Sequence, residues 1–285
     1  IYSFGYIREY DNQGEYYMMV VLFIGAMMGL VYSTNLIFLY MFWELSAVCC
    51  WRLIGFYRER IAVERANKAY FITVAGALVM LAGFLGIYAE TGTFDLEAMK
   101  GFSLPAWTVV LILFGILSKS ATFPLHSWLP DAGVAPSPVT SLLHAAVLVK
   151  IGVFAYARLF VQTFAIPEIF TLAVPVVAAV SALLSAGLAL GANDIKRVIA
   201  YSTVSQLAFI LAGISSGTQA GFVGGLLYIL AHAIAKGGLF LCAGIVEHSV
   251  HTKDIAKMGG LAKRFPLTAI AFALCAASVM GIPPF

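Results

Sequence analysis

Long apolar stretches, separated by short polar connections, run through this chain from about residue 17 to its last residue. A helix needs about 20 mostly apolar residues to cross the hydrocarbon core of a bilayer. Nine segments meet this requirement, and the pattern therefore predicts nine membrane-spanning helices. Their predicted ranges are 17–32, 35–55, 69–89, 106–123, 138–160, 169–190, 195–213, 219–246 and 266–285. No connection between them is long or polar enough to form a soluble domain.

The composition agrees with this pattern. Of the 285 residues, 61% are apolar and only 11% are charged, whereas a soluble domain carries about 25% charged residues. We therefore expect an all-α polytopic protein that lies in a lipid bilayer and does not bind nucleic acid. The chain begins with Ile, shows no signal-peptide pattern and stops within an apolar run, so we expect it to be a fragment of a longer protein. The four cysteines lie in apolar runs without metal-ligand spacing, which predicts buried free thiols and no metal site.

Basic residues predict the orientation of the helices, because cytoplasmic loops are enriched in Lys and Arg. If the loop after the second helix is cytoplasmic, twelve basic residues fall on that side. They are Arg8, Arg52, Arg58, Arg60, Arg65, Lys68, Lys196, Arg197, Lys253, Lys257, Lys263 and Arg264. Only Lys100 and Arg158 fall on the other side. This bias supports both the count of nine and the orientation with basic loops in the cytoplasm.

The remaining three lysines, Lys119, Lys150 and Lys236, lie inside predicted helices, as does Glu44. A charged residue at the bilayer centre costs about 3 kcal/mol even on lenient scales, so these side chains are expected to face the protein interior or water. The alternatives are lysines that snorkel to the interface and a glutamate that only joins two helices. His144 is open to two interpretations: an interfacial histidine bonded to a carbonyl, or a member of a proton relay.

His232 and Lys236 are four residues apart in "YILAHAIAKGGLF" and share one helix face. A neutral imidazole can take a proton from an ammonium and pass it on. Burial disfavours the charged form of lysine, and a nearby carboxylate favours it. Glu44 and Lys119 could therefore switch a lysine between holding and releasing a proton. Arginine could not serve, because it does not deprotonate in proteins.

Two proline breaks interrupt the helical pattern. Pro124 lacks an N–H and leaves the carbonyl of Ser120 without its helical partner, and "GIPPF" repeats such a break at Pro283 and Pro284. An ordinary helix end at Ala121 or Thr122 is the alternative at the first break. Broken helices mark ion sites in transporters. The breaks are five helices apart, an odd number, which predicts an inverted repeat: residues 17–161 form one complete unit and 168–285 a truncated second one.

Four stretches resemble a known family. They are "NLIFLYMFWELSAVCCWRLIGFY", "SKSATFPLHSWLPDAGVAPSPVTSLLHAAVLVKIGVF", "DIKRVIAYSTVSQLAFI" and "LLYILAHAIAKGGLFLCAG". The chain resembles the antiporter-like subunits of respiratory complex I (NADH:quinone oxidoreductase) and the large subunits of Mrp-type Na+/H+ antiporters, and the same superfamily includes the membrane arms of membrane-bound hydrogenases. The stretches "IYSFGYIREYD" and "RLIGFY" are most similar to the distal complex I subunit or the Mrp large subunit.

The resemblance implies at least fourteen helices in the whole protein and a role for each unusual residue. Glu44 matches the family's membrane glutamate and Lys119 its broken-helix lysine. Lys150 matches the connecting lysine, and His232 and Lys236 match the central polar axis. The ionisable residue of the second broken helix would follow "GIPPF" and lie beyond Phe285.

From this resemblance we expect a proton-translocating subunit of a redox-driven pump. The chain carries no redox motif, so we expect it to be part of a translocase without electron-transfer chemistry of its own. NADH, FMN, iron–sulfur clusters and quinone would belong to partner subunits, and other membrane-arm subunits would be its partners. The expected location is a bacterial or archaeal plasma membrane, or an organellar inner membrane. The alternatives are an Mrp-type Na+/H+ antiporter subunit, a hydrogenase membrane-arm subunit, and a purely structural subunit whose buried charges only specify packing.

Overall fold

The computed structural model of the chain describes residues 1–282, and within that range its regular secondary structure is helical. Its first half contains α1 (Tyr2–Tyr6), α2 (Gln13–Tyr32), α3 (Leu36–Ile54), α4 (Arg60–Thr91), α5 (Ala106–Lys119), α6 (Trp128–Asp131), α7 (Ser137–Thr140) and α8 (Lys150–Tyr156). Its second half contains α9 (Ile169–Leu190), α10 (Ile195–Ser215), α11 (Gln219–Val250), α12 (Leu261–Arg264) and α13 (Pro266–Met280).

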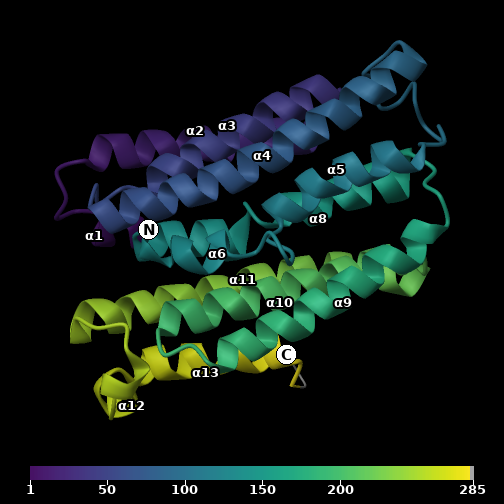
Figure 1. Cartoon of the computed structure of the whole chain (residues 1–285). Coiled ribbons are helices and arrows are strands. Elements are labelled where there is room, and N and C mark those ends of the chain that lie inside the picture. The colour runs from purple at the N-terminus through teal and green to yellow at the C-terminus, as the bar shows by residue number, and fades with distance from the viewer. Residues whose placement is uncertain (283–285) are drawn as a thin grey trace.

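The structure confirms the all-α membrane fold. Within the described residues, seven segments are long and apolar enough to cross a membrane, counting residues 137–163 as one interrupted segment. The shorter apolar helices α5 and α13 fill the fourth and ninth predicted positions. Figure 1 shows the long helices running side by side, with α2, α3 and α4 in one group, α9, α10 and α11 in another, and α5, α6 and α8 between them.

The helix that was predicted to break at Pro124 ends a few residues before that proline. The helix predicted over 106–123 ends at Lys119, because Ala121 adopts a left-handed backbone conformation (φ 52°) and Pro124 cannot continue the helix. The polar backbone at the break finds partners inside the protein: the Trp128 indole donates to the Ser118 carbonyl at 3.0 Å, and the Ser181 hydroxyl accepts from the Phe123 N–H at 3.0 Å. Non-helical backbone is tolerated at membrane depth when protein buries it.

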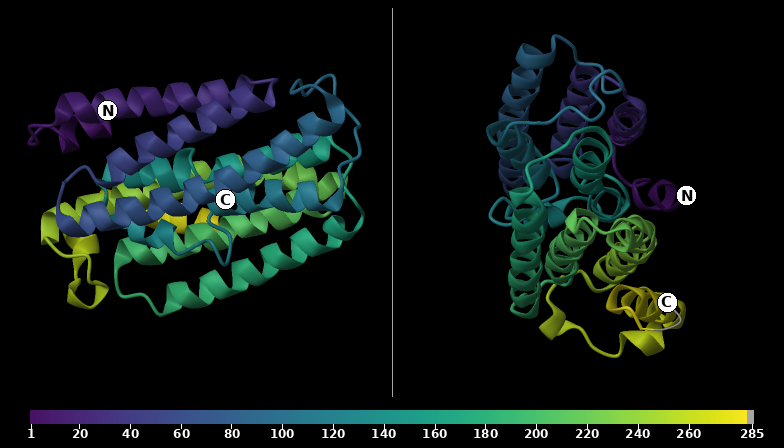
Figure 2. Two further views of the ribbon diagram at one scale, coloured as in Figure 1. Left: turned by 45° about the horizontal axis from the view of Figure 1, so that its top comes forward. Right: turned by 90° about the vertical axis from the view of Figure 1, so that its right-hand side faces the viewer.

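The segment after the break folds into the protein. Trp128, Leu129 and Pro130 of α6 are buried, in agreement with the absence of Lys and Arg from this stretch. Asp131 at the end of α6 accepts ion pairs from Lys68 of α4 (2.7 Å) and Arg197 of α10 (3.4 Å). The broken helix is thereby tied to both long-helix groups, which Figure 2 shows end-on in its right-hand view.

The helix predicted over 138–160 is not one regular helix. The α-helices α7 and α8 alternate with π-helical turns at Ser141–Ala146 and Ala157–Thr163. The N–H of Val147 bonds to the carbonyl of Leu142, five residues back, at 3.1 Å. Such π-helical turns are frequent at functional sites. The periodicity of apolar residues gives no sign of them, because apolar side chains cover this segment on nearly every side.

Several local features recur between the two halves. The Asn35 side chain caps α3 and forms a backbone bridge to Asp95, and the Asp194 side chain caps α10 and forms a backbone bridge to Asp254. In each case the bridged residues are 60 apart (95 − 35 and 254 − 194), and the helix that follows the capped one, α4 or α11, has 32 residues. Such recurrences are what an inverted repeat would produce. The division into repeats over 17–161 and 168–285 stays a prediction.

The second predicted break falls at the edge of the described chain. The helix expected over 266–285 ends at Met280, and Gly281 has a left-handed conformation (φ 70°), which caps a helix without a steric penalty. Pro283 and Pro284, predicted as part of the break, lie outside the described residues.

Candidate functional site: a row of buried basic side chains

Lys119 ends α5 at the helix break and is fully buried. Its ammonium donates to the carbonyl of Trp43 on α3 at 3.2 Å and lies 5.5 Å from the centre of the Trp43 ring. Both contacts offer electron density to a cation without neutralising it. The early end of α5 therefore places Lys119 against α3, the helix that also carries Glu44.

Glu44 follows Trp43 and lies within Coulombic range of Lys119, but no ion pair of 4.0 Å or less joins the two side chains. One carboxylate oxygen of Glu44 is buried and has no hydrogen-bond partner. The predicted pair is thus close but not in contact. This arrangement leaves both groups free to change partners.

A small cavity of about 10 Å³ borders Lys119, Cys50, Thr73, Trp128 and Leu148. A cavity needs roughly 10–15 Å³ to hold one water molecule. The cavity is therefore at the lower limit for a single water beside the ammonium. Such a water could carry a proton between Lys119 and its neighbours.

Lys150 begins α8, next to the end of α5. Its side chain is 6% exposed, and its ammonium donates to the carbonyl of Ala145 in the preceding π-helical turn. Two residues further on, Gly152 allows close packing: a Cβ there would lie 2.6 Å from the Ile116 carbonyl oxygen and 2.8 Å from the Ser120 Cβ. The absence of a side chain at Gly152 lets the helix that carries Lys150 approach the broken end that carries Lys119.

His144 is fully buried in the first π-helical turn, with its ring 4.9 Å from that of Phe240. Neither ring nitrogen has a hydrogen-bond partner within the described protein. The structure therefore shows no bond from His144 to a carbonyl, which one of the two interpretations from the sequence requires. The unpartnered nitrogens leave His144 able to accept or donate a proton through water.

His232 and Lys236 lie one turn apart on α11, and both are buried. The Lys236 ammonium donates to the Ser202 hydroxyl at 2.6 Å and to the Ile199 carbonyl at 3.4 Å, both on α10. His232 has no hydrogen-bond partner at either nitrogen and lies within Coulombic range of Lys150 and Lys236. The predicted residues of α8 and α11 therefore belong to one electrostatic group.

A further buried lysine was not among the predicted site residues. Lys196, counted with the loop charges, is only 2% exposed and pairs at 2.6 Å with Glu247 near the end of α11. The predicted helix stopped at residue 246, whereas α11 continues to Val250 and includes this glutamate. Lys196 and Glu247 are 51 positions apart (247 − 196), and no sequence pattern links them. Only the packing of α10 against α11 brings them together.

Comparison with known proteins supports the resemblance. Residues 33–285 match the family described as "NADH:quinone oxidoreductase/Mrp antiporter, TM". The chain is 37% identical to NAD(P)H-quinone oxidoreductase chain 5 of Synechocystis sp., over all of this chain and 44% of the relative. It is also 37% identical to Na(+)/H(+) antiporter subunit A1 of Staphylococcus epidermidis, over all of this chain and 38% of the relative. The chain thus spans less than half the length of these relatives.

Two solved structures share the fold. A chain of the Mrp complex from Dietzia sp. superposes with a TM-score of 0.88 at 34% identity, over 95% of this chain and 30% of that one. A chain of the membrane-bound sulfane sulfur reductase, an archaeal respiratory membrane complex, superposes with a TM-score of 0.85 at 28% identity. The match covers 94% of this chain and 57% of that one. On the family match over most of its length, the chain belongs to the NADH:quinone oxidoreductase/Mrp antiporter transmembrane family.

Proposed function

We propose that this chain translocates protons across a membrane, along the buried row that includes Glu44, Lys119, Lys150, His232 and Lys236, with His144 as a further relay group. The observation that carries the proposal is the state of the three lysines. All are buried, and none takes part in an ion pair of 4.0 Å or less with a described carboxylate.

The cost of burying three lysines disfavours a purely structural role for them. Each lysine costs about 3 kcal/mol when placed at the membrane centre, and a buried charge that serves stability is normally paired. Carbonyl and hydroxyl contacts, like those of Lys119 and Lys236, accept a hydrogen bond from an ammonium and tolerate a neutral amine. Lysines in such surroundings are suited to lose and regain a proton.

The proposed switch is the distance between Glu44 and Lys119. When the carboxylate approaches, it favours the charged ammonium; when it withdraws, burial favours the neutral amine and the proton leaves. The proton would move toward Lys150 and then to His232 and Lys236, with water bridging the gaps. The chain's own residues bind and pass the proton, and the motion of Glu44 would come from a partner.

We propose partner membrane subunits in a multisubunit complex, because both solved relatives belong to such complexes by their descriptions. In the first form of the proposal the complex is redox-driven, as in a complex I-type or hydrogenase-type assembly. NADH, FMN, iron–sulfur clusters and quinone would then reside in other subunits. The membrane would be a bacterial or archaeal plasma membrane or an organellar inner membrane, with the basic loops in the cytoplasm.

A second candidate is Na+/H+ exchange driven by the proton gradient. It is favoured by the identity of 37% to a Na(+)/H(+) antiporter subunit, equal to the identity with the quinone oxidoreductase chain. Both candidates require proton movement through this chain. They differ in whether Na+ changes the proton flux, and in whether electron transfer elsewhere in the complex drives it.

The test uses the full-length protein in its complex, reconstituted in vesicles, with proton flux read from a pH-sensitive dye. Lys119→Ala is expected to lower the flux about 100-fold, because the switchable lysine is lost. Lys263→Ala, at an exposed lysine in the short helix α12, is the matched control and should retain full flux. Lys119→Ala with normal assembly and normal flux would refute the proposal and favour a structural subunit.

Glu44 offers a second measurement. Glu44→Gln should impair transport because it removes the charge that controls Lys119, and Glu44→Asp should largely retain it. Full activity of both variants would contradict the role given to Glu44. The same vesicles distinguish the two candidates: a flux that follows an imposed Na+ gradient supports exchange, and a flux that follows electron transfer and ignores Na+ supports the redox pump.

A further inference from the structure

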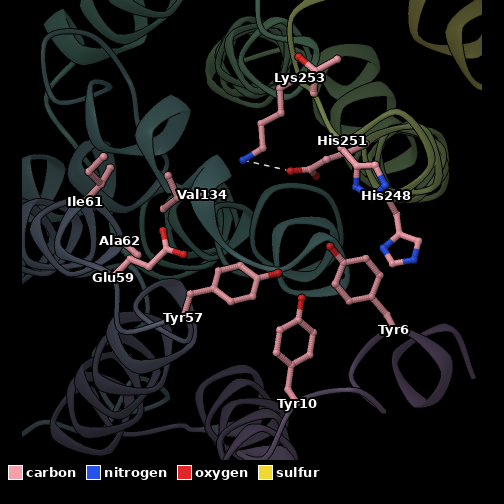
Figure 3. A pocket seen from close by; sticks show the side chains of 12 residues that line it. Tyr6, Tyr10, Tyr57, Glu59, Ile61, Ala62, Val134, His248, His251 and Lys253 are labelled. Carbon is pink, nitrogen blue, oxygen red and sulfur yellow. Dashed lines mark ion pairs between the residues drawn. The ribbon is translucent and has the colours of Figure 1, made fainter.

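A large cavity lies at the end of the protein that carries the basic loops. This cavity of about 580 Å³ lies between the chain around α1, the start of α4 and the end of α11. A cavity needs only about 10–15 Å³ to hold one water molecule, so this one has room for many. Figure 3 shows the hydroxyls of Tyr6, Tyr10 and Tyr57 converging on one side of it, with His248 and Lys253 on another.

The tyrosine side of the cavity offers neutral hydroxyl groups. Burial raises the pKa of the Tyr57 phenol well above its usual range, so this hydroxyl keeps its proton at neutral pH. The charged groups that border the cavity are Glu59, Glu247 and Lys253, and the imidazole rings of His248 and His251 also line it. A polar opening of this size, lined by titratable groups, is suited to water and protons more than to an apolar ligand.

Glu247 is the point where the cavity meets the protein interior. One of its carboxylate oxygens lies 3.2 Å from the ammonium of Lys253, which lines the cavity, and the other lies 2.6 Å from the ammonium of the buried Lys196. Figure 3 marks the outer of these two ion pairs. A single carboxylate thus links a lysine that lines the cavity to a lysine that is buried.

Lys196 in turn points toward the buried row. Its ammonium donates to the carbonyl of Ala135 at 3.4 Å, in the segment that leads through α7 to His144. His144 lies within Coulombic range of both Lys196 and Lys236, and its two ring nitrogens are free. The order from the cavity inward is therefore Glu247, Lys196, His144 and Lys236.

We propose that this cavity is the proton-loading vestibule of the channel, and that Glu247 passes protons from its water to Lys196. The inference rests on the proposed function and adds to it the side and the residues of proton uptake. Lys196 as ammonium gives its proton, through water, to neutral His144 and becomes an amine. The Glu247 carboxylate takes a proton from a hydronium ion in the vestibule and releases water. The resulting carboxylic acid protonates the Lys196 amine, which restores the ion pair and advances one proton.

The experiment places a cysteine at the vestibule in the full-length protein within its reconstituted complex. Thr252 lines the cavity, whereas Lys263 lies exposed in the short helix α12 and is not among the residues that line the cavity. Each cysteine variant is treated with a charged, membrane-impermeant thiosulfonate reagent from the basic-loop side, and the protein without an introduced cysteine is the reagent control. Modification of Thr252→Cys is expected to lower proton flux about tenfold or more, because the bulky adduct fills the opening. Modified Lys263→Cys should retain full flux.

Complete labelling of Thr252→Cys with unchanged flux would overturn the vestibule. Glu247→Gln gives an independent readout: a large loss of flux with Glu247→Asp active supports the carboxylate as proton carrier, and full flux in Glu247→Gln refutes that role. Lys119→Ala, measured in the same vesicles, separates the two proposals. If Lys119→Ala is inactive and labelled Thr252→Cys is fully active, proton translocation stands and the vestibule fails; if Lys119→Ala is active, the proposed function itself fails.

Discussion

The contact between α8 and the broken end of α5 gives a sharp test of the row's geometry. Replacing Gly152 by alanine would place a Cβ 2.6 Å from the Ile116 carbonyl oxygen and 3.0 Å from the Ser120 N–H nitrogen. Ordinary van der Waals contact begins at 3.4 Å, so the two segments must separate by about 0.8 Å (3.4 − 2.6). The obstructing atoms are backbone and cannot rotate away.

The expected cost of this crowding is about 1–3 kcal/mol, the usual range for overpacking a buried contact. The effect on transport should be larger, because a displacement near 1 Å at a reacting group can cost about 100-fold in rate. Gly152→Ala is therefore expected to lower the melting temperature of the complex and to reduce proton flux by 10–100-fold, roughly, since Lys150 moves away from Lys119.

Gly25→Ala on α2 is the matched control, because a Cβ there meets nothing within 4 Å. In a helix interior alanine is favoured over glycine by up to about 1 kcal/mol, so this variant should be at least as stable as the parent protein. The assay compares initial proton flux and thermal stability for equal amounts of assembled complex. Gly152→Ala with parental flux and stability would refute the close approach of Lys150 to the helix break.

Two further predictions concern other parts of the structure. Lys119→Arg should abolish transport as fully as Lys119→Ala, because arginine keeps the charge but cannot release its proton. The pH-sensitive dye assay in vesicles measures this. An active arginine variant would show that Lys119 does not need to lose its proton. Asn35→Ala and Asp194→Ala should each lower the free energy of unfolding by about 1 kcal/mol, because each removes a helix cap. Thermal unfolding in detergent measures this loss. A much larger loss at only one of the two positions would argue against their equivalence in a repeat.

The sequence predicted the number and nature of the helices well, because hydrophobic length is a direct requirement of the bilayer. All nine predicted segments contain an apolar helix, within the described residues. The predicted helix ends were less accurate, because polar residues can extend a helix beyond its apolar part. The helix predicted over 69–89 begins at Arg60, and the one predicted over 219–246 continues to Val250. The second extension brings Glu247 into a helix.

The site was predicted in part. Lys119, Lys150 and Lys236 could be singled out because an ionisable residue in an apolar helix is costly and needs a reason. The π-helical turn that carries His144 could not be foreseen, since the apolar pattern around it fits several helix types. Lys196 looked like a loop charge because it follows the cap Asp194 at a helix start, and only tertiary packing shows that it is buried.

The central claim is that protons pass along the buried basic row. The most direct test is the proton flux of Lys236→Met in the full-length protein and its complex, compared with Lys263→Met. Methionine keeps much of the length of lysine but has no group that titrates. The account predicts a loss of about 100-fold for Lys236→Met at normal assembly and parental flux for Lys263→Met. Equal and full flux in both variants would contradict it.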